Sequence, residues 1–82
     1  MPTILREKGF RFYFYMADRY EPPHIHVSRD DCVAKLWLDP LEFAHIDGFR
    51  HHDCNEITHI TEMHLDEFIQ AWYRIFGKLN HD

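Results

Sequence analysis

Cysteine is scarce in this chain: only Cys32 and Cys54 occur among its 82 residues, and they form no CxxC motif. Small secreted domains that depend on disulfides carry many more cysteines. The N-terminus also lacks the basic stretch and following apolar stretch that mark a secretory signal. We therefore expect a cytoplasmic protein with free thiols, and a single structural disulfide is the alternative.

Glycine and long apolar runs are scarce as well. The three glycines, Gly9, Gly48 and Gly77, lie far apart, so no glycine-rich loop is available to hold a phosphate. No apolar run approaches the roughly 20 residues that a membrane-spanning helix requires. The sequence therefore predicts no cofactor and no contact with a membrane.

Basic residues are fewer than acidic ones, nine against fourteen, and the formal net charge is −5. This balance argues against a protein that binds nucleic acid by overall charge alone. The acidity is concentrated after residue 38, and residues 1–38 contain slightly more basic than acidic side chains. Any contact with nucleic acid is therefore expected in the N-terminal half.

Hydrophobic residues make up 45% of the chain and aromatic residues 16%, which is enough to form a folded core. A chain of this length has room for one core only. We therefore predict a single domain over residues 1–82.

Apolar and polar residues alternate over residues 10–16, 24–28 and 32–38, which is typical of strands with one buried face. Residues 2–6 are expected to form a further strand, joined to the next by the turn Glu7-Lys8-Gly9. The prediction is an antiparallel sheet of three to four strands over residues 2–38. The apolar face of this sheet would have to be buried against another element of the chain.

Helix signals follow the sheet. Asp39-Pro40 has the pattern of a helix start, so residues 40–47 are expected to form a short helical element that ends at Gly48. Apolar residues at helical spacing then predict an amphipathic helix over residues 54–76, with a possible break near His64. The predicted fold class is α+β, with this C-terminal helix packed on one face of the sheet.

The other face of the predicted sheet is the strongest functional signal. Arginine and lysine bind phosphate, aromatic rings stack on bases, and histidine transfers protons near neutral pH. We therefore assign catalytic roles to His24, His26 and Lys35 and substrate binding to the side chains of Arg11, Tyr13, Tyr15 and Trp37.

Two other interpretations of the same residues remain open. Exposed polar and aromatic side chains also form protein interfaces, so the face fits a homodimer or a small protein partner. His24 and His26 lie on the same side of one strand, so with a third ligand they could bind a metal. The helical set His52, Glu56 and His59 is interpreted as ordinary surface.

Several motifs occur together: the aromatic strand 10–15, Pro22-Pro23-His24-Ile25-His26-Val27, the run Lys35-Leu36-Trp37-Leu38-Asp39-Pro40 and a terminal helix with Trp72. In these motifs the chain resembles the bacterial family of domains of unknown function numbered 4160. The resemblance implies a small bacterial protein of a two-gene module, similar to toxin–antitoxin pairs. Combined with the polar face, it leads us to expect action on, or binding of, RNA.

Overall fold

The computed structural model describes residues 3–77, so the predicted domain ends at 1–2 and 78–82, including Pro2 of the predicted sheet, lie outside the described residues. The elements in chain order are β1 (Thr3–Glu7), β2 (Phe10–Tyr13), the 3-10 helix η1 (Met16–Tyr20), β3 (His24–Arg29), β4 (Cys32–Leu38), β5 (Leu41–Asp47), α1 (His51–Met63) and α2 (Leu65–Phe76).

The five strands form one antiparallel sheet in the order β1-β2-β3-β4-β5, so each strand pairs with its neighbour in sequence. Two-residue turns make three of the four connections, and residues 14–23, which contain η1, join β2 to β3. Lys8 and Gly9 both have positive φ, at 53° and 85°, which is the backbone twist that a tight hairpin between β1 and β2 requires. The sheet is therefore built entirely from local hairpins.

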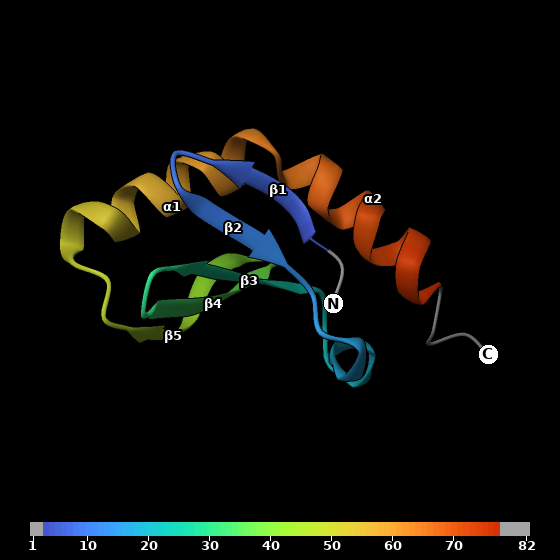
Figure 1. Cartoon of the computed structure of the whole chain (residues 1–82). Helices are drawn as coiled ribbons and strands as arrows, with labels where there is room; N and C mark the ends of the chain where they lie inside the picture. The colour runs from blue at the N-terminus through green and yellow to red at the C-terminus, as the bar shows by residue number, and fades with distance from the viewer. Residues whose placement is uncertain (1–2, 78–82) are drawn as a thin grey trace.

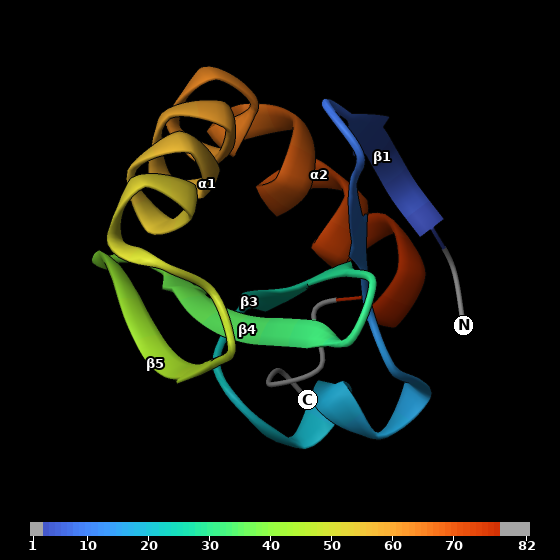
Figure 2. The same ribbon diagram turned by 60° about the vertical axis from the view of Figure 1, so that its left-hand side comes forward.

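Both helices lie on one side of the sheet, and η1 lies on the other side (Figures 1 and 2). Between the helices and the sheet the side chains of Phe12, Phe14, Phe68 and Trp72 are buried. Their rings touch across the layer: Phe12 and Phe68 have centroids 5.4 Å apart, and Phe14 and Trp72 5.3 Å apart. This aromatic core determines which face of the sheet the helices cover.

The predicted sheet of three to four strands is wrong, because the described residues form five, and the fold remains α+β. The fifth is β5, which occupies the segment predicted as the helical element 40–47. Leu41 and Phe43 are half-buried and pair with Leu38 and Leu36 of β4. Pairing supplies hydrogen bonds to an otherwise open sheet edge, and this outweighs the helix-start pattern at Asp39-Pro40.

The C-terminal helical region forms two helices with a break at His64, where the sequence analysis placed a possible break, but its start differs from the predicted residue 54. Helix α1 begins at His51, because the Asp53 carboxylate accepts a hydrogen bond from the backbone N–H of Arg50 at 3.2 Å and from Arg29 at 2.8 Å. Asp53 therefore lies inside the first turn and is not its cap. The helical run then breaks at His64, whose imidazole bonds Glu67 and, at 3.2 Å, Glu7 of β1.

Two smaller predictions concern a strand end and the thiols. The strand predicted for 10–16 ends at Tyr13, and its last predicted residue, Met16, is the first residue of η1. Cys32 and Cys54 are both free. Neither α1 nor α2 is long and apolar enough to cross a lipid bilayer.

Candidate functional site

A cluster of three ionisable side chains lies where η1 packs against β3. Asp18 comes from η1, and His24 and His26 come from the same side of β3. The Nε2 atom of His24 lies 3.0 Å from Asp18 Oδ1, and the Nε2 atom of His26 lies 3.1 Å from Asp18 Oδ2. We refer to Asp18, His24 and His26 as the Asp-His cluster.

Asp18 is held in place by the local backbone. Its Oδ2 atom accepts a hydrogen bond of 2.7 Å from the backbone N–H of Tyr15, which closes the first turn of η1. Burial alone would raise the pKa of this carboxyl group, but the hydrogen bonds from Tyr15 and His26, together with the nearby His24 imidazole, outweigh it and lower the pKa below its ordinary value. Asp18 is therefore an oriented carboxylate at neutral pH.

His24 is fully buried, with a relative exposure of 0%, although the alternation pattern places it on the polar face. Its Nδ1 atom lies 2.8 Å from the carbonyl oxygen of Pro22. A carbonyl only accepts, so Nδ1 carries the proton, and in a neutral ring Nε2 has a free lone pair. That Nε2 atom is buried without a hydrogen-bond partner, even though the Asp18 carboxylate is close.

His26 is half-buried and lies at the open side of the cluster. Its Nε2 atom is within 3.2 Å of both carboxylate oxygens of Asp18. Burial lowers the pKa of His26 below its ordinary value of 6.5, and the carboxylate of Asp18 opposes this shift only in part. The imidazole is therefore neutral at pH 7, with Nε2–H directed to Asp18 and the lone pair on Nδ1.

Aromatic rings surround the cluster. The centroid of His26 is 5.5 Å from that of Tyr13 and 4.6 Å from that of Tyr15, and His24 is 5.5 Å from Trp37. Burial and the nearby Tyr15 hydroxyl raise the pKa of Tyr13 to about 12, so its phenol is neutral at physiological pH. The rings shield the cluster from water on several sides.

The predicted basic residues lie over these rings. The Arg11 guanidinium is 4.3 Å from the centre of Tyr13, and its Nε donates to Thr3 Oγ1 at 2.9 Å. The Lys35 ammonium is 4.5 Å from the centre of Trp37 and 2.6 Å from Glu21 Oε1. Lys35 is therefore paired with a carboxylate, whereas Arg11 has no carboxylate within 4 Å among the described residues.

The structure thus brings all the predicted site residues into one connected group around Asp18. Their exposure differs from the prediction, which placed them all on an open platform. His24 is enclosed by η1, and Tyr13 retains only 4% exposure because Arg11 and His26 cover its ring. The residues open to solvent are Tyr15 and, in part, Arg11, His26, Lys35 and Trp37.

Asp18 is the member of the cluster that sequence analysis missed. It lies between two predicted strands, eight residues before His26 in the chain. The available signal is the three-residue spacing from Tyr15 to Asp18, which suits a carboxylate that caps a turn. Nothing in the sequence shows that this turn folds back beneath β3.

A second arginine lies next to Arg11 on the same face. Arg6 of β1 and Arg11 of β2 are directly opposite one another in the strand register. Like charges in this position destabilise a sheet. The described residues place no carboxylate within 4 Å of either guanidinium, so the pair is suited to binding an anion.

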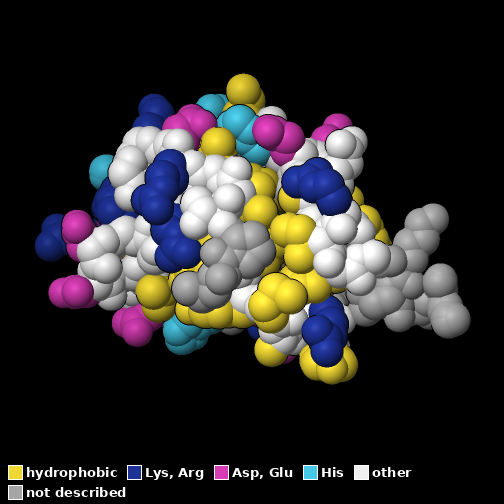
Figure 3. All heavy atoms as spheres, turned by 45° about the vertical axis from the view of Figure 1, so that its right-hand side comes forward, with side chains coloured by type: hydrophobic (Ala, Val, Ile, Leu, Met, Phe, Trp, Pro, Cys, Tyr) yellow, Lys and Arg dark blue, Asp and Glu magenta, His cyan; other side chains and the backbone are white. Residues whose placement is uncertain are grey.

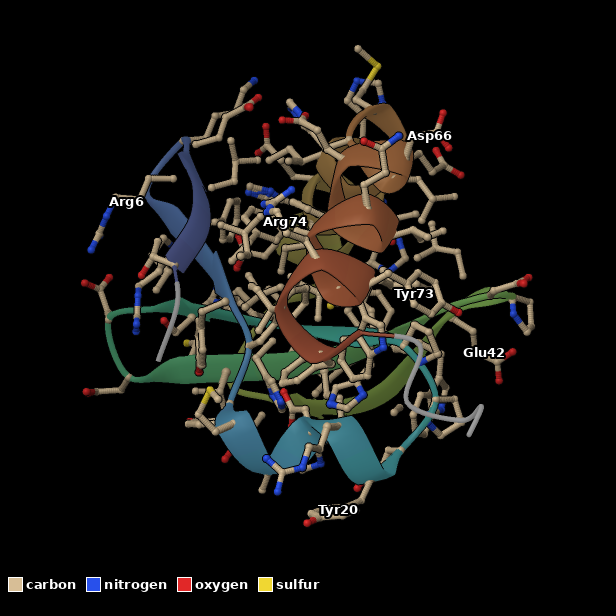
Figure 4. All side chains as sticks on the ribbon, turned by 90° about the vertical axis from the view of Figure 1, so that its right-hand side faces the viewer. Arg6, Tyr20, Glu42, Asp66, Tyr73 and Arg74 are labelled. Atoms are coloured by element: carbon tan, nitrogen blue, oxygen red, sulfur yellow. The ribbon has the colours of Figure 1, made fainter. Side chains whose placement is uncertain are left out.

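An open pocket of about 490 Å³ lies between η1 and α2 and is lined by Arg19, Tyr20, Glu21, Pro22, Pro23, Trp72 and Tyr73. Tyr20 projects from η1 and Tyr73 from α2, with 78% and 43% exposure (Figure 4). In the space-filling view, hydrophobic side chains form a band bordered by Lys and Arg (Figure 3). The pocket between η1 and α2 is therefore bordered by two exposed tyrosine rings.

The helical set His52, Glu56 and His59 does not form a comparable cluster. Glu56 pairs with Lys8 at 3.1 Å, and His52 lies 3.6 Å from Asp53. Within residues 3–77, the Asp-His cluster is the group whose ligand atoms all lie within 4.8 Å of one another.

Comparison with known proteins identifies the family. A family model described as Domain of unknown function (DUF4160) matches residues 9–73, which include β2 to β5, both histidines of β3 and most of the helical layer. The chain belongs to the DUF4160 family. No curated protein and no solved structure matches it. The matched range includes the whole Asp-His cluster and excludes Arg6.

Proposed function

We propose that this chain acts on RNA through the polar side of its sheet, as one half of a two-gene module similar to toxin–antitoxin pairs. The observation that carries this proposal is the His26 imidazole, which is neutral, oriented by Asp18 and open to solvent on one side. A histidine in that state is a general base at neutral pH. The resemblance to the family supplies the two-gene context.

The chemistry that suits these residues is transfer of the phosphoryl group within RNA. His26 Nδ1 takes the proton of a ribose 2′-hydroxyl, and the 2′-oxygen attacks the adjacent phosphorus. The bond from phosphorus to the 5′-oxygen breaks, and this oxygen takes a proton from water. The proton held by His26 then neutralises the hydroxide that remains, which restores the neutral imidazole. The products are a 2′,3′-cyclic phosphate and a 5′-hydroxyl, so the reaction consumes no co-reactant.

The neighbouring residues support binding of the substrate. Arg6 and Arg11 lie opposite one another and fit a phosphate of the backbone. The ammonium of Lys35, opposite His26 in the strand register, adds positive charge at the attacked phosphate. Buried His24 has a positioning role, because its ring packs 5.0 Å from that of His26 and limits its rotation.

Cleavage and binding of a labelled mixed-sequence RNA test the proposal. The assay uses the full chain in excess chelator, which removes any contribution from a metal. We expect His26→Gln to abolish formation of the cyclic phosphate and Arg11→Gln to weaken RNA binding about tenfold. Arg74→Gln, which removes the same charge from α2, serves as the control and should change neither.

Expression in bacteria provides an independent test. We expect the chain alone to arrest growth, the product of the neighbouring gene to relieve the arrest, and His26→Gln to be harmless. Binding to RNA without cleavage would leave only the binding function. The enzymatic proposal fails if the unmodified chain is harmless and leaves the RNA intact.

The second candidate is a protein interaction domain without catalytic activity. The observation that favours it is the set of large exposed hydrophobic residues at η1 and α2: Tyr15, Met16, Tyr20 and Tyr73. Patches of this kind mark binding sites for a second copy or another protein. Tight binding of the neighbouring gene product, lost in a Tyr20→Ser variant and accompanied by no effect on RNA, would assign this function instead.

A further inference from the structure

We propose that Asp18, His24 and His26 form a binding site for one divalent transition metal ion, with Zn²⁺ as the reference ion. This inference is independent of the action on RNA. Two imidazole nitrogens and one carboxylate are a ligand set that first-row transition metals accept, and further positions remain open for water. The three side chains come from two elements that are adjacent only in the folded chain.

The first argument is the state of His24. Its Nδ1–H is committed to the carbonyl oxygen of Pro22, so in the neutral ring the buried Nε2 carries a lone pair and lies 3.0 Å from the carboxylate of Asp18. Two electron-rich atoms at 3.0 Å repel one another unless a cation lies between them. A metal ion in this position would also give Nε2 the partner that it lacks among the described residues.

The second argument is geometric. Ligand atoms about 2.1 Å from a metal, at the angles of octahedral or tetrahedral coordination, lie about 3.0–3.4 Å from one another. The two distances from Asp18 to the imidazoles, 3.0 Å and 3.1 Å, fall in this range. All ligand atoms of the three residues lie within 4.8 Å of one another. A ring rotation that moves one Nε2 atom by about 1 Å therefore brings all three ligands to coordination distance.

The third argument is the outer shell. Histidines that bind metals usually donate their other ring N–H to a carbonyl or carboxylate, which orients the ring. His24 does this with Pro22, and the carboxylate of Asp18 is oriented in the same way by the backbone N–H of Tyr15. Both ligands are therefore held in place before any ion arrives.

Metal binding has a consequence for His26. The free chain has Nε2–H directed to Asp18, so binding of a metal at Nε2 must shift this single ring proton to Nδ1. His26 then has no lone pair for proton transfer. We expect a bound metal to inhibit RNA cleavage, so the metal-free and metal-bound chains would be the active and inactive states of one site.

The test is titration of chelator-treated chain with Zn²⁺ in competition with a chromogenic chelator, and with Co²⁺ followed by its visible absorption. We expect one equivalent per chain, and at least a tenfold loss of affinity in Asp18→Asn and in His26→Gln. His45→Gln is the matched control, because His45 is exposed, lies opposite Lys35 and is outside the cluster. His52→Gln/His59→Gln removes the competing surface histidines.

Each outcome decides the proposal. Circular dichroism of each variant identifies a loss that is due to misfolding, and His26→Gln, at a half-buried position, keeps the test valid if Asp18→Asn does not fold. The site is overturned if the chain binds less than one equivalent of metal. It is also overturned if binding is lost in His52→Gln/His59→Gln and retained in His26→Gln. Because the readout is metal content, it does not depend on whether the chain cleaves RNA.

Discussion

The two faces of the sheet use the same strands in different ways. On the face toward the helices, rings from β2 and α2 pack against one another in the hydrophobic core. On the opposite face, β3 contributes imidazoles, and the short η1 folds over them and brings a carboxylate to their nitrogens. The aromatic packing stabilises the domain. The packing of η1 on β3 holds a carboxylate within about 3 Å of two imidazole nitrogens.

Fully buried side chains occur on both faces of the sheet. His24 lies on the polar side, yet it is as inaccessible as Phe12 on the apolar side. A buried polar atom without a partner has a cost in stability that a buried ring does not have. Such atoms occur on both sides of the sheet, at His24 Nε2 and at Trp72 Nε1.

The largest effect is expected on the apolar face. Phe12→Ala should lower the free energy of unfolding by about 3–5 kcal/mol, because it removes a ring that fills the space between β2 and α2. Urea denaturation measures this change. Tyr73→Ala, at an exposed position next to Trp72, is the control, and an equal loss there would contradict the packing.

His24→Ala tests the buried side chain on the polar face. We expect it to destabilise the domain by about 1–3 kcal/mol, because the carbonyl of Pro22 loses its hydrogen-bond partner and a fully buried ring is removed. The same urea assay in chelator gives the value. An effect below that of the exposed His45→Ala would show that His24 is not held by these contacts.

The pH dependence of stability distinguishes the two faces further. The pKa of His26 is lowered by folding, so the unfolded chain takes up a proton more readily, and stability is lost as the pH falls below the ordinary value of 6.5. Asp18, whose pKa is also lowered, adds a loss at more acidic pH. His64 acts in the opposite direction, because Glu67 raises its pKa, but it lies near the surface.

Urea midpoints of the chelator-treated chain at pH 7.5 and pH 5.5 check this prediction. The groups that face His26 are Asp18, His24, Lys35, Tyr13 and Tyr15, and all remain in a His26→Gln variant. We expect this variant to lose less stability on acidification than the unmodified chain. Equal losses would place the acid sensitivity elsewhere.

The smallest effect is expected at the rim of the polar face. Lys35→Gln breaks an ion pair with Glu21, whose side chain is 47% exposed, so it should change the free energy of unfolding by at most about 1 kcal/mol. Lys8→Gln, which breaks the exposed pair with Glu56, should have a similar effect. A clearly larger loss at Lys35 would show that the rim also stabilises the fold.

Sequence reasoning found the elements whose pattern is local. The alternation at Phe10, Phe12 and Phe14 and the helical spacing of Phe68 and Trp72 predict the buried layer, because each reflects a periodic backbone with one buried side. The failures occurred where a tertiary contact overrides a local signal. At Leu41–Asp47 the open edge of β4 converts a helix-start pattern into a strand, and Arg29 moves the start of α1 by binding Asp53.

The sequence by itself therefore determined the α+β composition, the apolar and polar sides of β2 to β4, and the placement of His24 and His26 on one side of a strand. Only the tertiary structure decided that Asp18 joins them, that His24 is buried, and that Arg6 lies opposite Arg11. The reason is physical. Periodicity specifies the direction of each side chain within one element, whereas a site is made by side chains from separate elements, and their distances follow from how those elements pack.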